Sequence, residues 1–124
     1  MNLAKILVAD DEQDIRTFTN RTLTHEGHTV TLAEDGELAI ELLDENDYDL
    51  VILDIMMPNK NGLEVVEYMK NTERLRSVPI FLFSASGPID NLTEVVEEMV
   101  DVYLRKPFRK TAFLQVVNKL LKIA

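Results

Sequence analysis

The sequence predicts an α/β protein, in which helices cover both faces of one doubly wound, five-stranded parallel sheet. Two observations predict this class. Five short apolar runs recur along the chain, and segments with helical spacing of apolar residues separate them. Strands that are apolar on both faces and alternate with helices call for a parallel sheet with right-handed crossovers.

The predicted strands are short, continuous apolar or β-branched runs, each followed by polar or turn-forming residues. They cover residues 6–8, 30–32, 50–53, 80–83 and 102–104. The chain therefore reads as strand then helix, five times.

The predicted helices place apolar residues at positions i, i+3, i+4 and i+7. The pattern is clearest in two sets: Leu92, Val95, Val96 and Met99, then Phe113, Val116, Val117, Leu120 and Leu121. An earlier helix is expected around residues 15–23. Asp35 is a predicted N-cap for a helix from Gly36, and the pair 61–62 stands where another helix should begin.

Composition limits the function before any motif is considered. The 124 residues fit a single domain over 1–124, and 46% of them are apolar, which suffices for one core. The formal charge of -9 disfavours direct binding of nucleic acid or of an anionic membrane surface. The absence of cysteine excludes disulfides, and the apolar run at residues 5–9 is too short to span a membrane, so we expect a cytoplasmic location.

Open parallel sheets bind their ligands beyond the carboxyl ends of the strands, so the strand ends hold the functional candidates. The first strand is followed by the acidic run 10–12, the third by Asp54, the fourth by Ser84 and the fifth by Lys106. Each of these groups has a bland interpretation alone, such as a solvated acid or a turn. Their coincidence at four strand ends instead indicates one site.

A magnesium site follows from the acids. Clustered carboxylates repel one another unless a cation lies among them, and hard oxygen ligands favour Mg²⁺, with Mn²⁺ as a second possibility. We expect Asp11, Asp54 and the backbone carbonyl of Met56 to hold the ion. An aspartate beside such an ion can attack phosphorus, with Lys106 neutralising one phosphoryl oxygen and Ser84 donating a hydrogen bond to another.

The motifs of this chain resemble those of a known family, the CheY-like receiver domain of two-component response regulators. The resemblance spans essentially the whole chain. It rests on the acid pair at 10–11, the Asp-Ile-Met-Met-Pro run at 54–58, Gly62, Ser84-Ala85, Tyr103 and Lys106-Pro107-Phe108. It implies a flavodoxin-like fold with strand order 2-1-3-4-5, and phosphorylation by a sensor histidine kinase or a histidine phosphotransfer protein. It also implies an output surface made by the fourth helix, the fifth strand and the fifth helix, where a downstream protein binds.

The resemblance also implies a role for each matching position. Asp54 would be the phosphoacceptor, Asp10 and Asp11 the acid pair that holds the metal, and Lys106 the cation that contacts the phosphoryl group. Ser84 and Tyr103 would be the switch pair: Ser84 moves toward the phosphoryl group and Tyr103 turns inward. The resemblance further implies a cis peptide before Pro107. The pair 99–100, Met-Val, departs from the Gly-Ala common in the family.

Other interpretations stay open. A magnesium-dependent phosphohydrolase could form the same aspartyl phosphate, although Met56 stands where it would need a water-activating group. A flavin-binding module of this architecture would need a phosphate loop where the chain has the acidic run 10–12. A receiver-like interaction module that is never phosphorylated is the third alternative. We expect Met56 and Met57 to pack, and His25 and His28 to be ordinary surface residues.

Overall fold

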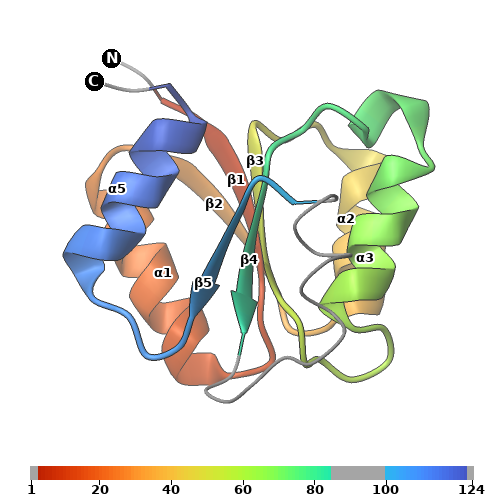
Figure 1. Cartoon of the computed structure of the whole chain (residues 1–124). Helices are drawn as coiled ribbons and strands as arrows, with labels where there is room; N and C mark the ends of the chain where they lie inside the picture. Colours follow the sequence, from red (N-terminus) through yellow and green to blue (C-terminus); the bar gives the residue numbers. More distant parts are fainter. Residues whose placement is uncertain (1–2, 85–99, 123–124) are drawn as a thin grey trace.

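A computed structural model describes residues 3–84 and 100–122 and shows one five-stranded parallel sheet (Figure 1). The strands lie in the order β2-β1-β3-β4-β5, which confirms the predicted fold class and strand order. In chain order the elements are β1 (Lys5–Ala9), α1 (Gln13–His25), β2 (Thr29–Ala33), α2 (Gly36–Glu45), β3 (Leu50–Asp54), α3 (Gly62–Lys70), the short 3-10 helix η1 (Glu73–Leu75), β4 (Ile80–Ser84), β5 (Val102–Arg105) and α5 (Lys110–Leu120).

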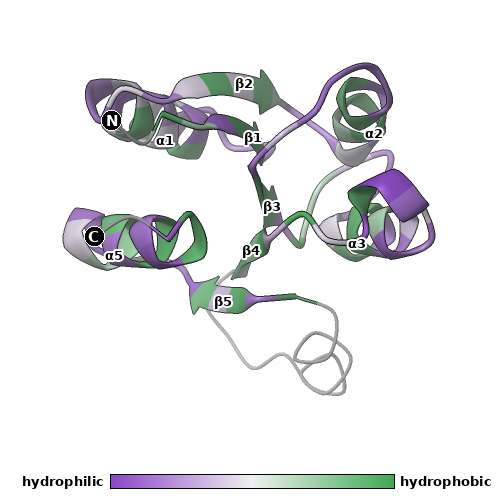
Figure 2. Ribbon diagram, turned by 90° about the horizontal axis from the view of Figure 1, so that it is seen from above, coloured by the Kyte–Doolittle hydropathy of each residue, from purple (hydrophilic) through white to green (hydrophobic). Residues whose placement is uncertain are grey.

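The sheet separates two layers of helices, α1 and α5 on one face and α2 and α3 on the other (Figure 2). Successive strand residues point to opposite faces. On β1, Leu7 therefore belongs to the core on the α2–α3 side, whereas Ile6 and Val8 belong to the core on the α1–α5 side. The central strands β3 and β4 are buried along their whole length, as expected for strands covered on both faces.

The core on the α1–α5 side gathers all the phenylalanines of the chain. Their ring centroids lie between 4.7 and 6.0 Å apart in the contacting pairs. The set is Phe18, Phe81, Phe83, Phe108 and Phe113. Phe108 follows directly after the Lys106-Pro107 pair, so this aromatic packing anchors the loop that carries Lys106.

Two helices begin where the sequence predicts, and side chains cap both. Asp35 Oδ1 accepts a hydrogen bond from the Leu38 N–H at 2.8 Å, while its Oδ2 accepts one from Asn59 Nδ2 at 2.8 Å. Asn61 and Glu64 form a reciprocal capping box at the start of α3. These bonds satisfy amide groups that a helix start would otherwise leave unpaired. Because Asn59 reaches back to Asp35, they also tie the β3–α3 loop to α2.

His28 differs from the sequence prediction. Its side chain is buried, and its Nδ1 accepts a hydrogen bond from the Ala4 N–H at 3.1 Å. The expectation that His28 is a surface residue is therefore wrong, because it links the connection before β2 to the start of β1. The predicted helix at residues 92–99 lies outside the described residues. Within residues 3–84 and 100–122, no helix is both long enough and apolar enough to cross a membrane.

Candidate functional site

The predicted site residues meet at the carboxyl edge of the sheet, where backbone hydrogen bonds continue the strand pairing. The Asp10 N–H donates to the Ala33 carbonyl at 3.0 Å, and the Lys106 N–H donates to the Ser84 carbonyl at 2.8 Å. The Lys106–Pro107 peptide is cis, as the family resemblance implies. The loops after β1 and β5 are thus held by the sheet itself, which limits how far their side chains can move.

Four carboxylates gather at this edge. Asp10, Asp11, Glu12 and Asp54 can each place one oxygen so that all lie within 4.8 Å of one another. Asp10 and Asp54 are buried, whereas Asp11 and Glu12 are exposed. The cluster thus consists of two buried acids and two acids that face solvent.

Lys106 is the cation of this cluster. Its Nζ lies 2.9 Å from Asp10 Oδ2, 3.1 Å from Glu12 Oε1 and 3.5 Å from Asp54 Oδ1. The Lys106 side chain is 11% exposed, so these ion pairs are partly shielded from water. The ammonium therefore bridges the two buried acids and the exposed Glu12. The sequence predicts such a cation beside Asp54.

The buried acids are costly to ionise. Burial, with the neighbouring Asp10 charge as a smaller cause, raises the pKa of Asp54 to about 7 against the opposing effect of Lys106. Burial also raises the pKa of Asp10, although the Glu12 N–H and Lys106 oppose that rise. Burial of Lys106 would lower its pKa, but its contacts with the acids outweigh this and raise the pKa. One ammonium only partly offsets the crowding of negative charge.

These residues fit a bound Mg²⁺ ion. Apart from the Lys106 ion pair, the buried Asp10 Oδ2 meets no hydrogen-bond donor in the described parts of the chain. The donor set around it is all oxygen, which Mg²⁺ prefers. A divalent cation would relieve the repulsion from Asp10, which adds to the effect of burial in raising the pKa of Asp54.

The loop after β3 brings α3 against the backbone of Asp54. A Cβ atom on Gly62 would lie 2.2 Å from the Asp54 carbonyl oxygen, so only glycine fits there. The Gly62 N–H donates to the Ile55 carbonyl at 2.9 Å. In the same loop the Met57 side chain is buried, as expected, but that of Met56 is 67% exposed. The expectation that Met56 packs is therefore wrong, and its side chain lies at the surface two residues after Asp54.

The two predicted switch residues contact each other directly. Ser84 is buried at the end of β4, and its Oγ donates a hydrogen bond to the Tyr103 hydroxyl at 2.9 Å. The Tyr103 ring is half-buried against the core on the α2–α3 side. In this structure the Ser84 hydroxyl is thus directed to Tyr103, and the Tyr103 ring is only partly inside the core.

Two contacts at the site were not predicted from the sequence. Lys106 donates a hydrogen bond to Glu12, a residue for which no separate role was predicted. Arg16 Nη1 donates to the Asp10 carbonyl at 2.8 Å and so places a second cation near the acids. Glu12 could have been suspected from its place in the acidic run 10–12. Arg16 lies one turn into α1, and only the direction of that helix brings it back to β1.

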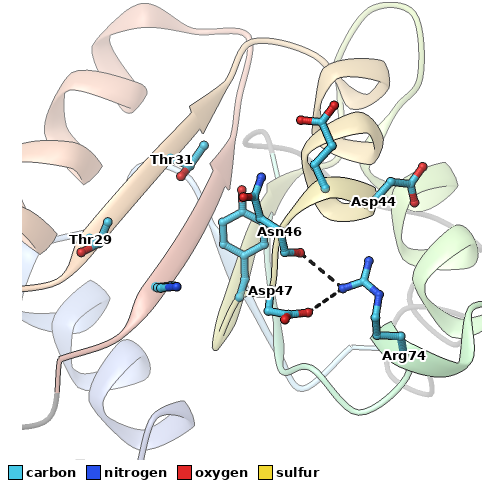
Figure 3. Close-up of a pocket in the computed structure, with 9 residues that line it drawn as sticks. Thr29, Thr31, Asp44, Asn46, Asp47 and Arg74 are labelled. Carbon is cyan, nitrogen blue, oxygen red and sulfur yellow. Dashed lines mark hydrogen bonds and ion pairs between the residues drawn. The ribbon is translucent and has the colours of Figure 1, made fainter.

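A separate polar pocket lies at the opposite edge of the sheet (Figure 3). It has a volume of about 570 Å³, and Thr29 and Arg74 are among its lining residues. Arg74 donates to the Asn46 carbonyl at 3.3 Å and to Asp47 Oδ1 at 2.7 Å, as the dashed lines show. Its guanidinium therefore satisfies groups just after α2. The pocket contains none of the predicted site residues.

The chain matches a known protein family over most of its length. A family model described as the response regulator receiver domain matches residues 6–118. The chain belongs to this family of receiver domains. One curated relative is the transcriptional regulatory protein CusR of Escherichia coli K12, 36% identical over 118 residues, which are 95% of this chain and 51% of CusR. Another is the response regulator MprA of a Mycobacterium species, at 35% identity over 95% of this chain and 50% of that protein. This receiver domain spans about half the length of these relatives.

Solved structures agree with the receiver fold. The receiver domain of the Francisella response regulator 1452 superimposes with a TM-score of 0.85 at 32% identity, covering 96% of this chain and 97% of that one. The response regulator TrrA of Thermotoga maritima, solved in complex with Mg(2+)-BeF, gives a TM-score of 0.82 at 34% identity and covers 94% and 97%. Both likenesses extend over nearly the whole receiver domain.

Proposed function

We propose that this receiver domain accepts a phosphoryl group on Asp54 with the help of Mg²⁺. The observation that carries the proposal is the environment of Asp54: a buried carboxylate at the end of β3, 3.5 Å from the Lys106 ammonium, within a cluster of acids. Phosphoryl transfer to a carboxylate is catalysed chiefly by positioning and by cations that neutralise the charge of the transferred oxygens. Lys106 supplies one, and Asp10, Asp11, Asp54 and the Met56 carbonyl would hold the other.

The reaction is a displacement at phosphorus. One Asp54 carboxylate oxygen forms a bond to the phosphorus while the bond from phosphorus to the donor breaks, and the donor leaves with that electron pair. Asp54, with Asp10, Asp11 and the Met56 carbonyl, would hold Mg²⁺, which would supply positive charge to the transferred oxygens and favour the ionised form of Asp54. The Lys106 ammonium neutralises another oxygen. Ser84 would donate a hydrogen bond to the phosphoryl group after leaving Tyr103.

The phosphoryl donor is, on this proposal, a phosphohistidine side chain of a sensor histidine kinase or of a histidine phosphotransfer protein. Membership of the receiver family supports this class of partner. The solved complex of TrrA with Mg(2+)-BeF supports the metal, because that protein shares 34% identity and nearly the whole fold with this chain. The relatives' names describe transcriptional and response regulators, so a role in controlling a downstream protein target is the matching output.

The output step would pass through Ser84 and Tyr103. When Ser84 turns toward the phosphoryl group, it gives up its hydrogen bond to the Tyr103 hydroxyl. The half-buried Tyr103 ring would then turn further inward, into the space that Ser84 leaves. Because Tyr103 is on β5, its response alters the face made by the predicted fourth helix, β5 and α5, and with it the affinity for a partner. An amide spectrum that is the same around Tyr103 with and without a phosphoryl mimic would contradict this step.

We also propose that the domain is a phosphoacceptor rather than a turnover enzyme. The exposed Met56 side chain offers no group that could activate water beside Asp54, and Glu12 is paired with Lys106. Its catalysis would be limited to its own phosphorylation and dephosphorylation. Rapid, repeated release of phosphate from small phosphomonoesters would instead favour the phosphohydrolase.

The test is the intact mass of the protein after incubation with Mg²⁺ and acetyl phosphate. We expect a gain of one phosphoryl group that needs Mg²⁺ and is removed by hydroxylamine, which cleaves acyl phosphates. Asp54→Ala should gain nothing, whereas Asp14→Asn, on the exposed side of α1, should behave as the wild type. The absence of any adduct, together with no binding of Mg²⁺, would favour the interaction module that is never phosphorylated.

A further inference from the structure

Glu12 stands at the mouth of the site and takes part in no step of the mechanism above. Its backbone N–H donates to Asp10 Oδ1 at 2.9 Å, which holds its main chain against this buried carboxylate. It is the N-cap residue of α1, yet its side chain caps no helix amide. The carboxylate reaches across to Lys106 Nζ instead, at 3.1 Å. The side chain of Glu12 is 58% exposed, against 11% for Lys106.

The contacts of Lys106 leave its ammonium fully engaged. The group has three N–H donors, and three carboxylates lie around it at 2.9, 3.1 and 3.5 Å. A phosphoryl group on Asp54 brings oxygen acceptors and up to two negative charges to the same ammonium. Asp10 cannot withdraw, because it is fully buried. Glu12 is the only one of the three carboxylates with room to move into solvent.

We propose that Glu12 is a positioning residue that holds Lys106 at the mouth of the site and competes with the incoming phosphoryl group for it. This inference rests on the proposed function. Phosphorylation then requires Glu12 to release the ammonium and to turn toward solvent. Glu12 therefore slows phosphorylation by small donors and weakens the binding of phosphoryl-like anions.

Two substitutions separate the contact from the charge. Glu12→Gln removes the charge and keeps the side-chain length. Glu12→Asp keeps the charge but is one methylene shorter, so it moves the carboxylate away from Lys106 while remaining a good N-cap. Glu12→Gln leaves at most a neutral hydrogen bond to Lys106, and Glu12→Asp withdraws the carboxylate from it. Because the ion pair is weakened in both, each variant should be phosphorylated about three- to ten-fold faster than the wild type. Asp14→Asn is the matched control, an equal change of charge on the exposed face of the same helix.

The experiment measures two quantities for the wild type and the three variants. The first is the rate of phosphoryl gain from acetyl phosphate at fixed Mg²⁺, followed by intact mass. The second is the half-saturating concentration of beryllofluoride with Mg²⁺, followed by amide NMR, which should fall by the same factor in both Glu12 variants. The NMR signal of the Lys106 side chain, recorded without Mg²⁺, should shift in both Glu12 variants and not in Asp14→Asn.

Each result separates this inference from the proposed function. Faster phosphorylation in both Glu12 variants, with an unchanged Asp14→Asn control, supports the competition. Rates equal to or below that of the wild type overturn it and leave Asp54 as the acceptor. A faster Glu12→Gln with an unchanged Glu12→Asp also overturns it, because the effect would then come from charge alone. A wild-type protein that gains no phosphoryl group contradicts the proposed function, and the inference is lost with it.

Discussion

Replacing Asp54 with asparagine should stabilise the metal-free protein, although Asp54 is the proposed centre of function. The pKa of Asp54 is raised from 3.8 to about 7, chiefly by burial. Between pH 3.8 and about pH 7, the folded state therefore keeps a proton on Asp54 that the unfolded chain has already lost. Stability then falls as the pH rises through this window, because the folded state binds more protons than the unfolded state. Above pH 7 the full cost of ionising the buried carboxylate is present.

The size of the effect follows from the shift. About three pKa units correspond to roughly 4 kcal/mol, at about 1.36 kcal/mol per unit. This is a ceiling, because local relaxation around the buried charge lowers the cost, so we expect Asp54→Asn to gain about 2–4 kcal/mol at pH 8. At pH 5.5 only about half of the window has been crossed, so the gain should fall to roughly half.

The assay is urea unfolding of the two proteins with a chelator present, at pH 8 and at pH 5.5. Glu41→Gln is the control, since it removes one negative charge from the exposed face of α2. If Asp54→Asn is no more stable than the wild type at pH 8, or if its extra stability does not shrink at pH 5.5, the pKa of Asp54 is not raised by burial as stated above. In that case the buried acids would not be under the electrostatic strain that the site geometry indicates.

Three further changes test the surroundings of the site. Gly62→Ala should cost about 3 kcal/mol in urea unfolding, because its new Cβ would collide with the Asp54 carbonyl; a cost below about 1 kcal/mol would contradict this close packing. Asp35→Ala should cost about 1 kcal/mol, because the Leu38 N–H loses its cap. An unchanged unfolding midpoint would show that this cap is dispensable. Met56→Asn should shorten the life of the phosphorylated form, because an amide orients water better than a thioether; mass spectra over time would reveal an unchanged lifetime if this is wrong.

Much of the fold could be predicted because local signals and the global arrangement agree. The apolar runs became the five strands, and Asp35 and Asn61 cap the helices that follow them. The strand ends at Asp54 and Lys106 converge because parallel strands all present their carboxyl ends to one edge. These features depend on patterns a few residues long, which a single sequence contains.

The remaining features depend on contacts between distant residues. Burial of His28 follows from its bond to Ala4, 24 residues away, and no local pattern reveals it. Met56 lies in the loop that brings Gly62 against the Asp54 backbone, and its apolar side chain is exposed there, which no local pattern predicts. The pairing of Glu12 with Lys106 spans 94 residues and required the positions of both loops.

The most direct test of the central claim is to locate the phosphoryl group on the chain. Borohydride reduces an aspartyl phosphate to homoserine, so the protein would be treated with acetyl phosphate and Mg²⁺, reduced, digested and sequenced by mass spectrometry. We expect homoserine at position 54 and nowhere else, and none when Mg²⁺ is withheld. Homoserine at position 10 or 11, or no homoserine in a protein that has gained phosphate, would contradict Asp54 as the acceptor.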